Sequence, residues 1–407
     1  MKKIVILGGG ASGMVAAIEA ARTNREAQIY ILEQKDALGK KLLATGNGRC
    51  NLTNENMSPS FFRSDHNAIV PQILERFDYK DTLGFFAELG LMTKSREGYI
   101  YPRSDQAQTL VNLLIGEVKN QKVIIKTGTK ALKVRHKNNV FEIQTEKEVL
   151  KADALILSCG GKAQPELGSD GSSYEFAKSL GHHLSPVVPS LVPLKVKNFS
   201  FKKASGVRAQ AKVSALIKGQ CVASDTGELQ ITAYGLSGIP IFQISRYVAK
   251  ALYEEIAVKV AVDFLPELSY EDFYLWIHQQ TKSRGDHTLV AFLTGIFNGK
   301  LVTEFLKKSH LPGGIPIQDL KKSQWDKLIA TIKNQEFLIE DTMGFQRAQV
   351  CAGGVLTTEV SPLNLESNYI KNLYLTGELL DVDGICGGYN LQWAFATGYL
   401  AGKEAAK

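Results

Sequence analysis

The chain has 407 residues, of which 44% are hydrophobic and 22% are charged, as is typical of a folded globular protein. This length predicts two or three domains, and no apolar run approaches the roughly twenty residues of a membrane span. The net charge of +7 permits an acidic partner, nucleic acid included, without favouring one, and the spacing of the five cysteines indicates neither a zinc site nor a disulfide framework.

The first predicted unit is a strand, a glycine-rich turn, a helix and a second strand. Residues 2–7 (KKIVIL) are typical of a buried parallel strand, and because they follow Met1 directly, no signal peptide is predicted and we expect a cytoplasmic protein. The glycines at 8, 10 and 13 form G-x-G-x-x-G ahead of a helix-favouring stretch at 14–22. A second apolar strand at 28–32 ends on Glu33. This is the full context of a dinucleotide-binding unit.

Each part of this unit has a physical role in holding a dinucleotide. Gly8 makes the tight turn, Gly10 lets the backbone approach the diphosphate, and Gly13 allows close packing of helix and strand. The first N–H groups of the helix bind the diphosphate, and Glu33 accepts hydrogen bonds from the adenosine ribose. The alternative is a loop that merely requires glycine, and the complete context argues against it.

Two further glycine-rich stretches follow in the first half of the chain. Residues 45–54 (TGNGRCNLTN) are typical of a loop around a polar ligand, where Arg49 would offer a planar donor, although an irregular surface turn is the alternative. A buried strand at 152–158 runs into Gly160 and a second glycine-rich loop, at the end of the strand where ligands bind in open α/β sheets. A helix at 172–180 is followed by His182 and His183, for which a structural role is favoured over a catalytic one.

Beyond residue 186 the pattern changes. Short strands at 195–196, 210–217, 228–232 and 257–264 predict an inserted β-domain or barrel. Helical patterns at 270–281, 288–298, 300–309 and 323–333 predict a small helical insert. We therefore expect three parts: residues 1–188 and 342–407, residues 189–265 and 330–341, and residues 266–329.

The dinucleotide-binding part resumes near the end of the chain. A strand at 373–376 leads into Gly377, Glu378, Asp381 and Asp383, groups suited to binding sugar hydroxyls. Glycines at 387 and 388 then open a helix rich in small residues, whose N-terminus would point at an electron-rich ring edge.

The stretches 45–54, 160–171 and 377–390 resemble those of the aminoacetone oxidase family of FAD-binding enzymes, also named NAD(P)/FAD-dependent oxidoreductases, some of which reduce dehydro-bile acids. The resemblance covers nearly the whole chain. It implies an α/β fold in which a Rossmann-like FAD-binding domain is interrupted by an inserted β-barrel-like domain that carries a small helical domain. It also implies FAD as the cofactor, with no metal.

By this resemblance, the FAD contacts fall on the following residues: Gly8, Gly10, Ala11, Ser12, Gly13, Glu33, Gln34, Lys41, Thr45, Gly46, Arg49, Cys50, Asn51, Ala131, Ser158, Gly160, Gly377, Glu378, Asp381, Asp383, Gly388, Asn390 and Leu391. Three positions depart from the family pattern on the substrate side. Tyr99, Ala233 and Cys351 stand where relatives often have arginine, histidine and threonine.

The absence of a second strand–G-x-G-x-x-G–helix unit favours an oxidase, in which a small amine or amino ketone gives hydride to FAD and oxygen then accepts the electrons, forming peroxide. The first alternative is an NAD(P)H-dependent flavin reductase of an unsaturated ketone or steroid-like substrate. The second is an RNA-binding or RNA-modifying flavoprotein. The redox partner is thus oxygen or NAD(P)H, and no catalytic acid or base is assigned. Cys50 and Cys386 are expected to pack rather than react.

Overall fold

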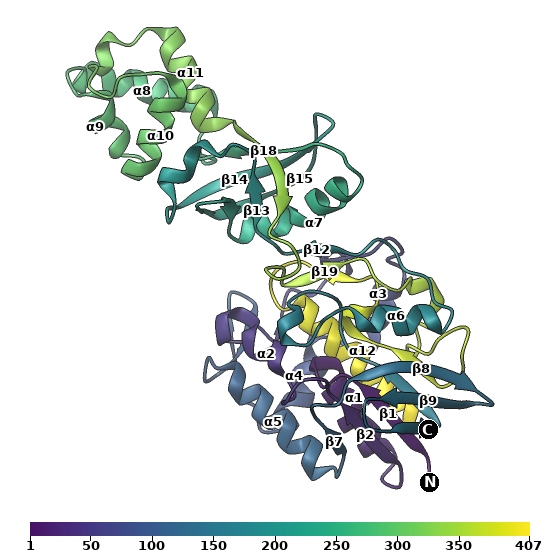
Figure 1. Cartoon of the computed structure of the whole chain (residues 1–407). Helices are drawn as coiled ribbons and strands as arrows, with labels where there is room; N and C mark the ends of the chain where they lie inside the picture. The colour runs from purple at the N-terminus through teal and green to yellow at the C-terminus, as the bar shows by residue number, and fades with distance from the viewer. The chain divides into compact units, whose positions relative to one another are not determined.

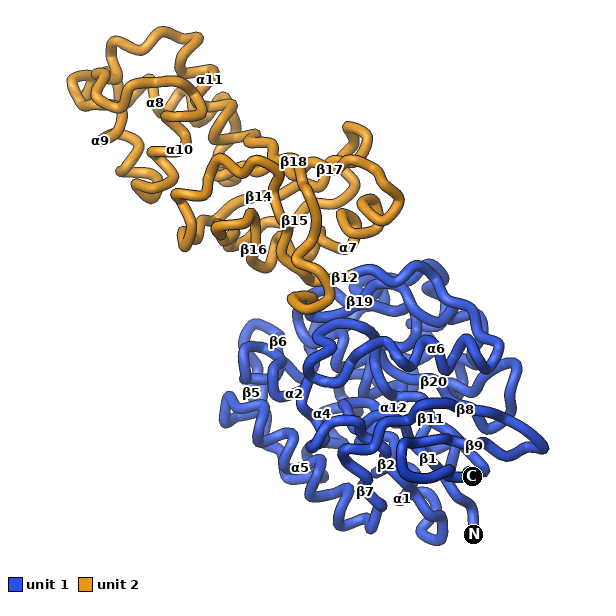
Figure 2. The backbone as a smooth tube through the Cα atoms, in the orientation of Figure 1, with its two compact units in different colours: residues 1–188, 349–407 blue, residues 189–348 orange.

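The computed structural model describes residues 1–407, which form two compact units (Figures 1 and 2). Unit 1 comprises residues 1–188 and 349–407, and unit 2 comprises residues 189–348. Each unit encloses a hydrophobic core of its own. No helix is long and apolar enough to cross a bilayer.

The centre of unit 1 is a five-stranded parallel sheet. Its order is β20 (Leu373–Leu375), β11 (Ala154–Leu157), β1 (Lys3–Leu7), β2 (Gln28–Leu32) and β7 (Ile124–Lys126). In register, Ile6 of β1 lies between Ile156 and Ile31. These strands are apolar along their length because both faces of the sheet are covered, as in doubly wound folds.

Two helices from opposite ends of the chain pack closely on each other in unit 1. They are α1 (Ala11–Thr23) and α12 (Tyr389–Ala406). A Cβ added at Gly398 would lie 2.3 Å from the Ser12 carbonyl oxygen, and one added at Gly402 would lie 2.3 Å from the Ala16 carbonyl oxygen. These glycines therefore let the two backbones touch, which brings the first turn of α1 beside the middle of α12.

Smaller elements surround this centre. One antiparallel sheet has the order β10 (Val149–Ala152), β9 (Val140–Thr145), β8 (Ala131–Lys137). A second has the order β3 (Thr53–Asn54), β6 (Tyr99–Pro102), β5 (Thr93–Arg96). In addition, β21 (Asp383–Gly384) pairs with β4 (Phe62–Arg63). The remaining helices are α2 (Lys40–Ala44), α3 (Ile69–Arg76), α4 (Tyr79–Glu88), α5 (Ala107–Asn120) and α6 (Ser172–Ser179). The short strands β12 (Val188–Ser190) and β19 (Val350–Ala352) lie where the chain passes between the units.

Unit 2 contains a closed antiparallel barrel. Its strands follow the order β13 (Leu194–Val196), β16 (Gly235–Ser237), β15 (Gln220–Ile231), β14 (Arg208–Ile217), β17 (Val258–Asp263) and β18 (Gln335–Thr342), with α7 (Ile239–Tyr253) packed on β14 and β15. Alternate residues of β17 are buried, as a barrel with a filled interior requires. Four helices lie between β17 and β18: α8 (Tyr270–Arg284), α9 (Leu289–Thr294), α10 (Gly299–Ser309) and α11 (Lys322–Lys333).

Candidate functional site

The three glycines of the first loop are required for different reasons. Gly8 has φ +99°, and a Cβ there would lie 2.5 Å from the Ser158 carbonyl oxygen. A Cβ at Gly13 would lie 2.0 Å from the Gly8 carbonyl oxygen. A Cβ at Gly10, in contrast, would meet no atom within 4 Å. The protein's own packing thus explains Gly8 and Gly13, whereas the space in front of Gly10 is left for a ligand.

This space lies at the N-terminus of α1. Gly10 is the N-cap residue, no side chain caps the helix, and its first turn holds no acidic residue. The N–H groups of the first turn, which begins Ala11–Ser12–Gly13, therefore remain available to an anion, and the helix dipole favours one. A Cβ added at Gly377 would lie 3.0 Å from the Ser12 Oγ, so the loop after β20 borders the same place.

Glu33 is held rigidly at the end of β2. Its Oε2 accepts a hydrogen bond from Gly9 N (2.8 Å), and its Oε1 accepts one from Lys35 N (2.8 Å). Burial raises the pKa of Glu33, although these two bonds partly oppose the rise. A carboxylate has about four acceptor positions, so two remain for the hydroxyls of a sugar.

The loop that follows β11 closes beside this carboxylate. Gln34 Nε2 donates to the Gly168 carbonyl oxygen (2.6 Å), and a Cβ at Gly168 would lie 3.6 Å from Glu33 Oε1. Thr129 N donates to the Glu33 carbonyl oxygen (2.9 Å), which places Ala131, the first residue of β8, two residues further along. The predicted contacts Glu33, Gln34 and Ala131 thus gather at one end of the sheet.

A second group of predicted contacts gathers around Glu378. Lys41 Nζ forms an ion pair with Glu378 Oε2 (2.8 Å), and Cys351 N donates to Glu378 Oε1 (2.6 Å). A Cβ at Gly160 would lie 4.0 Å from Glu378 Oε2. Ser158 Oγ lies 2.8 Å from Thr376 Oγ1 and links the ends of β11 and β20. Four separate segments therefore meet at a partly buried pair of opposite charges.

The loop 45–51 has both exposed and buried residues. Gly46 and Arg49 are exposed, while Thr45 Oγ1 donates to the Leu42 carbonyl oxygen (2.6 Å). Cys50 is fully buried, and burial raises the pKa of its thiol to about 11, so packing is its role. The Asn51 amide nitrogen faces the Thr53 and Ile100 carbonyl oxygens (3.0 and 3.1 Å), and its oxygen faces Gly388 N (3.3 Å).

Gly388 is the N-cap of α12, with φ +93° and no capping side chain. Asn390 forms a two-way clamp, since its Oδ1 accepts from Gly384 N and its Nδ2 donates to Gly384 O, each at 2.8 Å. Leu391 follows in the same turn and is half-buried. The clamp holds the preceding turn and leaves the first N–H groups of α12 directed toward a ligand.

Two of the acidic residues between β20 and α12, Asp381 and Asp383, are buried in the chain. Asp381 Oδ2 accepts from Asp65 N (3.1 Å), and Asp383 pairs with Arg63 in the β21–β4 ladder. Both side chains are almost completely inaccessible, at 1% and 0% exposure. These contacts fix the approach to α12, and cofactor contacts of the two carboxylates remain a prediction.

Two buried polar groups of this region, Gln392 and Tyr174, were not predicted from the sequence. Gln392, in α12, accepts from Thr53 Oγ1 (2.8 Å) and Thr82 Oγ1 (2.7 Å) and donates to the Phe77 carbonyl oxygen (3.1 Å). A glutamine inside a helix gives no sequence signal for such a role. The other is Tyr174, whose buried hydroxyl would lie 2.8 Å from a Cβ added at Gly161. The signal that could have found it is the glycine pair that ends the β11 strand.

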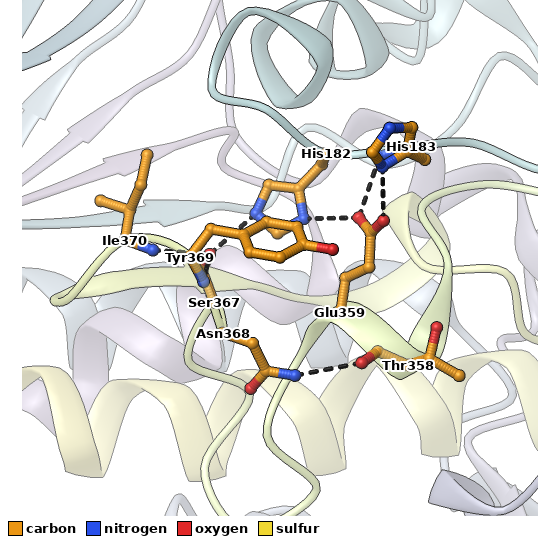
Figure 3. A network of polar contacts seen from close by, with 8 residues as sticks. All are labelled: His182, His183, Thr358, Glu359, Ser367, Asn368, Tyr369 and Ile370. Atoms are coloured by element: carbon orange, nitrogen blue, oxygen red, sulfur yellow. Dashed lines mark hydrogen bonds and ion pairs between the residues drawn. The ribbon is translucent and has the colours of Figure 1, made fainter.

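His182 and His183 belong to a polar network around Glu359 (Figure 3). His182 Nδ1 is 3.0 Å from Glu359 Oε2, and its Nε2 is 2.9 Å from Ser367 Oγ. Ser367 Oγ already accepts from the backbone N–H groups of Tyr369 and Ile370, so it donates to Nε2, and Nδ1 carries the proton. The serine is thus a buried structural donor, and the contacts favour a structural role for the histidine.

Acidification is expected to weaken unit 1 through this network. Burial lowers the pKa of His182 below 6.5, so its contribution to stability is complete above pH 6.5 and is lost as the pH falls through the lowered value. Burial opposes ionisation of Glu359, but hydrogen bonds from His183 and His182 outweigh it and lower its pKa below 4.5, which removes stability at lower pH still.

The replacement His182→Gln keeps a donor and an acceptor but does not titrate. The melting temperature of this variant is expected to vary less between about pH 7 and pH 5 than that of the wild type. Thermal unfolding at several pH values measures the effect, with the exposed His66→Gln as a control. If the melting temperature of His182→Gln fell with pH as steeply as that of the wild type, His182 would not be the group that titrates.

Comparison with known proteins identifies the family. The model of the HI0933-like protein Rossmann domain matches residues 2–404. The chain is 56% identical over 407 residues to a 3-dehydro-bile acid delta(4,6)-reductase of Clostridium scindens, covering 100% of both chains. It is also 28% identical over 402 residues to a ribosomal RNA dihydrouridine synthase of Haemophilus influenzae, covering 97% of this chain and 96% of that protein.

Solved structures share the fold. A 3-ketosteroid-delta4-(5alpha)-dehydrogenase from Rhodococcus jostii RHA1 superposes with a TM-score of 0.52 at 15% identity, covering 100% of this chain and 97% of that one. A 3-ketosteroid delta1-dehydrogenase from Sterolibacterium denitrificans gives a TM-score of 0.50 at 11% identity, with both chains covered completely. The prediction of an α/β Rossmann-type FAD-binding domain is confirmed.

The groups described above fit FAD. The open space before Gly10 at an uncapped helix suits the diphosphate, and the fixed Glu33 carboxylate suits the adenosine ribose. The uncapped N-terminus of α12 suits the electron-rich edge of the ring. The chain belongs to the HI0933-like protein family and is an FAD-dependent oxidoreductase.

Proposed function

We propose that the protein is a reductase that uses NAD(P)H and FAD to saturate a conjugated double bond in a 3-oxo steroid or a similar unsaturated ketone. The observation that carries this proposal is the 56% identity, over the full length of both chains, to the bile acid delta(4,6)-reductase. That relative supports a reductase more than the oxidase of a small amine or amino ketone that the sequence favours. The second of the three sequence hypotheses is therefore preferred.

The chemistry divides between the cofactor and the chain. FAD, when bound, supplies hydride transfer. The α1 N-terminus would hold the diphosphate, Glu33 would hold the adenosine ribose, and the α12 N-terminus would stabilise negative charge on the ring. Saturation of an enone adds a hydride to the carbon β to the ketone and a proton to the α carbon. Because the chain has a single G-x-G-x-x-G unit, NAD(P)H is proposed to visit the site, give its hydride to FAD and leave as NAD(P)+.

We also propose a role for each group of predicted contacts and for each predicted domain. Backbone groups at Gly8, Gly10, Gly160, Gly377 and Gly388 are proposed to approach the cofactor directly. Cys50 and Asn51 are proposed to hold the loop that borders the cofactor without contacting the cofactor through their side chains, since these side chains contact the protein itself. Residues 189–265 with 330–341 are proposed as an inserted β-domain, and 266–329 as its helical insert, which the barrel strands and helices α8–α11 support.

The test is anaerobic reduction of the FAD-loaded protein. NADH or NADPH is expected to bleach the flavin absorption, and a 3-oxo-4-ene steroid is expected to restore it with formation of the saturated ketone. Aminoacetone, added anaerobically and followed by oxygen, serves as the comparison. Bleaching by aminoacetone with release of peroxide, and no bleaching by either nicotinamide, would replace the reductase by the oxidase.

Modification of RNA is a second candidate. It is favoured by two ribosomal RNA dihydrouridine synthases, 28% and 26% identical along nearly the whole chain. RNA binding that weakens steeply with salt, together with loss of uridine absorbance on reduction, would support it.

A further inference from the structure

One face of the β5–β6 hairpin combines aromatic and cationic side chains. In β6, Ile100 and Pro102 are buried, whereas Tyr99 and Tyr101 alternate with them and lie on the other face. Tyr99 is 39% exposed. In register, Arg96 of β5 lies opposite Tyr99, and Lys94 lies opposite Tyr101. The hairpin thus presents two phenol rings bordered by two cations.

The two cations lie beside Tyr101. The Arg96 guanidinium carbon lies 5.8 Å from the centroid of the Tyr101 ring, and Arg96 Nη2 forms an ion pair with Asp105 Oδ2 (2.9 Å). Lys94 pairs with the same carboxylate, and Arg49 acts electrostatically on both Tyr101 and Asp105.

On this surface three cations gather around one carboxylate. Lys94 and Arg96 pair with Asp105, and Arg49 acts on it electrostatically, whereas Glu97 and Glu55 are further acids beside the hairpin turn. The Arg96 side chain is 49% exposed and retains guanidinium N–H groups beyond the one that binds Asp105. An exposed guanidinium beside aromatic rings favours a flat ligand that carries an anionic group.

This face adjoins the start of α12. A Cβ added at Gly387, one residue before the N-cap, would lie 3.0 Å from Tyr99 Cε1 and 3.0 Å from Tyr389 Cε2. Asn54 of β3, the strand next to β6, donates to the Gly387 carbonyl oxygen (3.0 Å). Tyr99 therefore borders the N-terminus of α12, and Tyr101 lies two residues further along β6, about 7 Å away.

We propose that this face is a subsite for the carboxylate-bearing end of an acidic 3-oxo steroid. Arg96 binds the carboxylate, and Tyr99 and Tyr101 form the wall against which the flat apolar body packs. The inference rests on the proposed function, in which the cofactor ring lies at the α12 N-terminus, so the double bond that it reduces would lie close by. It adds a preference for acidic over neutral steroids and assigns that preference to Arg96.

The test compares Arg96→Gln with wild type in the full-length, FAD-loaded protein. The probes are 3-oxo-4-cholenoic acid and its methyl ester, whose binding is followed by the change in flavin absorption. Wild type is expected to bind the acid more tightly than the ester. Arg96→Gln is expected to weaken binding of the acid about tenfold or more and of the ester less than about twofold, since one charge-assisted hydrogen bond is lost. Arg96→Lys should retain part of the preference, and Arg135→Gln, at an exposed position on β8, should change neither.

The outcomes separate this subsite from the proposed function. If wild type binds neither steroid and neither restores the bleached flavin, the proposed function fails and the subsite with it. If both steroids bind and are reduced, but Arg96→Gln keeps the wild-type preference for the acid, the subsite alone is wrong. Loss of salt-sensitive RNA binding in Arg96→Gln, with an unchanged preference for the acid, would likewise overturn it and assign the surface to RNA.

Discussion

Replacement of Gly10 by alanine is expected to leave the apoprotein as stable as wild type and to weaken FAD binding about tenfold or more. The added Cβ meets no protein atom within 4 Å, so the folded apoprotein has no steric reason to change. It does occupy the space in front of the uncapped N-terminus of α1, where the diphosphate must approach the N–H groups. Loss of one or two hydrogen bonds to a charged group accounts for an effect of this size.

The matched control is Gly13→Ala, three residues along the same loop. Its Cβ would lie 2.0 Å from the Gly8 carbonyl oxygen, so this variant is expected to lower the melting temperature of the apoprotein itself. Thermal unfolding without FAD and fluorescence titration with FAD measure the two effects separately. Wild-type FAD affinity in Gly10→Ala would refute the assignment of the diphosphate to this helix.

A large loss of stability is also expected from Gly398→Ala. The added Cβ would lie 2.3 Å from the Ser12 carbonyl oxygen, and backbone on both sides cannot move without separating α1 from α12. Overpacking of this kind typically costs about 1–3 kcal/mol and occasionally more. Because the first turn of α1 moves with it, the variant is also expected to bind FAD more weakly. Chemical denaturation of the apoprotein measures the first effect.

The control for helix propensity is Gly116→Ala in α5. A Cβ there meets no atom within 4 Å, and alanine replaces glycine inside a regular helix, so this variant is expected to be more stable than wild type by about 0.4–1 kcal/mol. If Gly398→Ala lowers the free energy of unfolding while Gly116→Ala raises it, the loss at Gly398 comes from the contact between α1 and α12. A stable Gly398→Ala would mean that the helices can separate at little cost.

Local patterns were enough to predict the dinucleotide-binding end of the fold. The apolar strands before Gly8 and Glu33, and the glycines between them, are consecutive in the chain, and their spacing reflects geometry within one βαβ unit. The FAD cofactor followed from the same stretch and from the family resemblance. The preference for an oxidase was weaker because it rested on the absence of a second nucleotide unit, and the relatives give more support to the reductase.

Other features depend on contacts between distant residues and leave no local pattern. Gln392 joins Thr53 and Thr82, which lie more than three hundred residues earlier in the chain. Closure of the barrel depends on Leu194 pairing with Thr342, across the whole of unit 2. Glu378 and Lys41 form an ion pair from opposite ends of unit 1, so neither residue predicts the other.

The division of unit 1 into two stretches of sequence has a consequence for biosynthesis. Unit 2 is continuous from 189 to 348 and emerges from the ribosome before β20 and α12 have been translated. Until then the nascent chain exposes the edge of β11, which β20 later covers. It also exposes the surface of α1 against which Gly398 and Gly402 of α12 later pack. An exposed strand edge can pair with other chains, so the interval before the final helix is made is when chaperones would matter most to this protein.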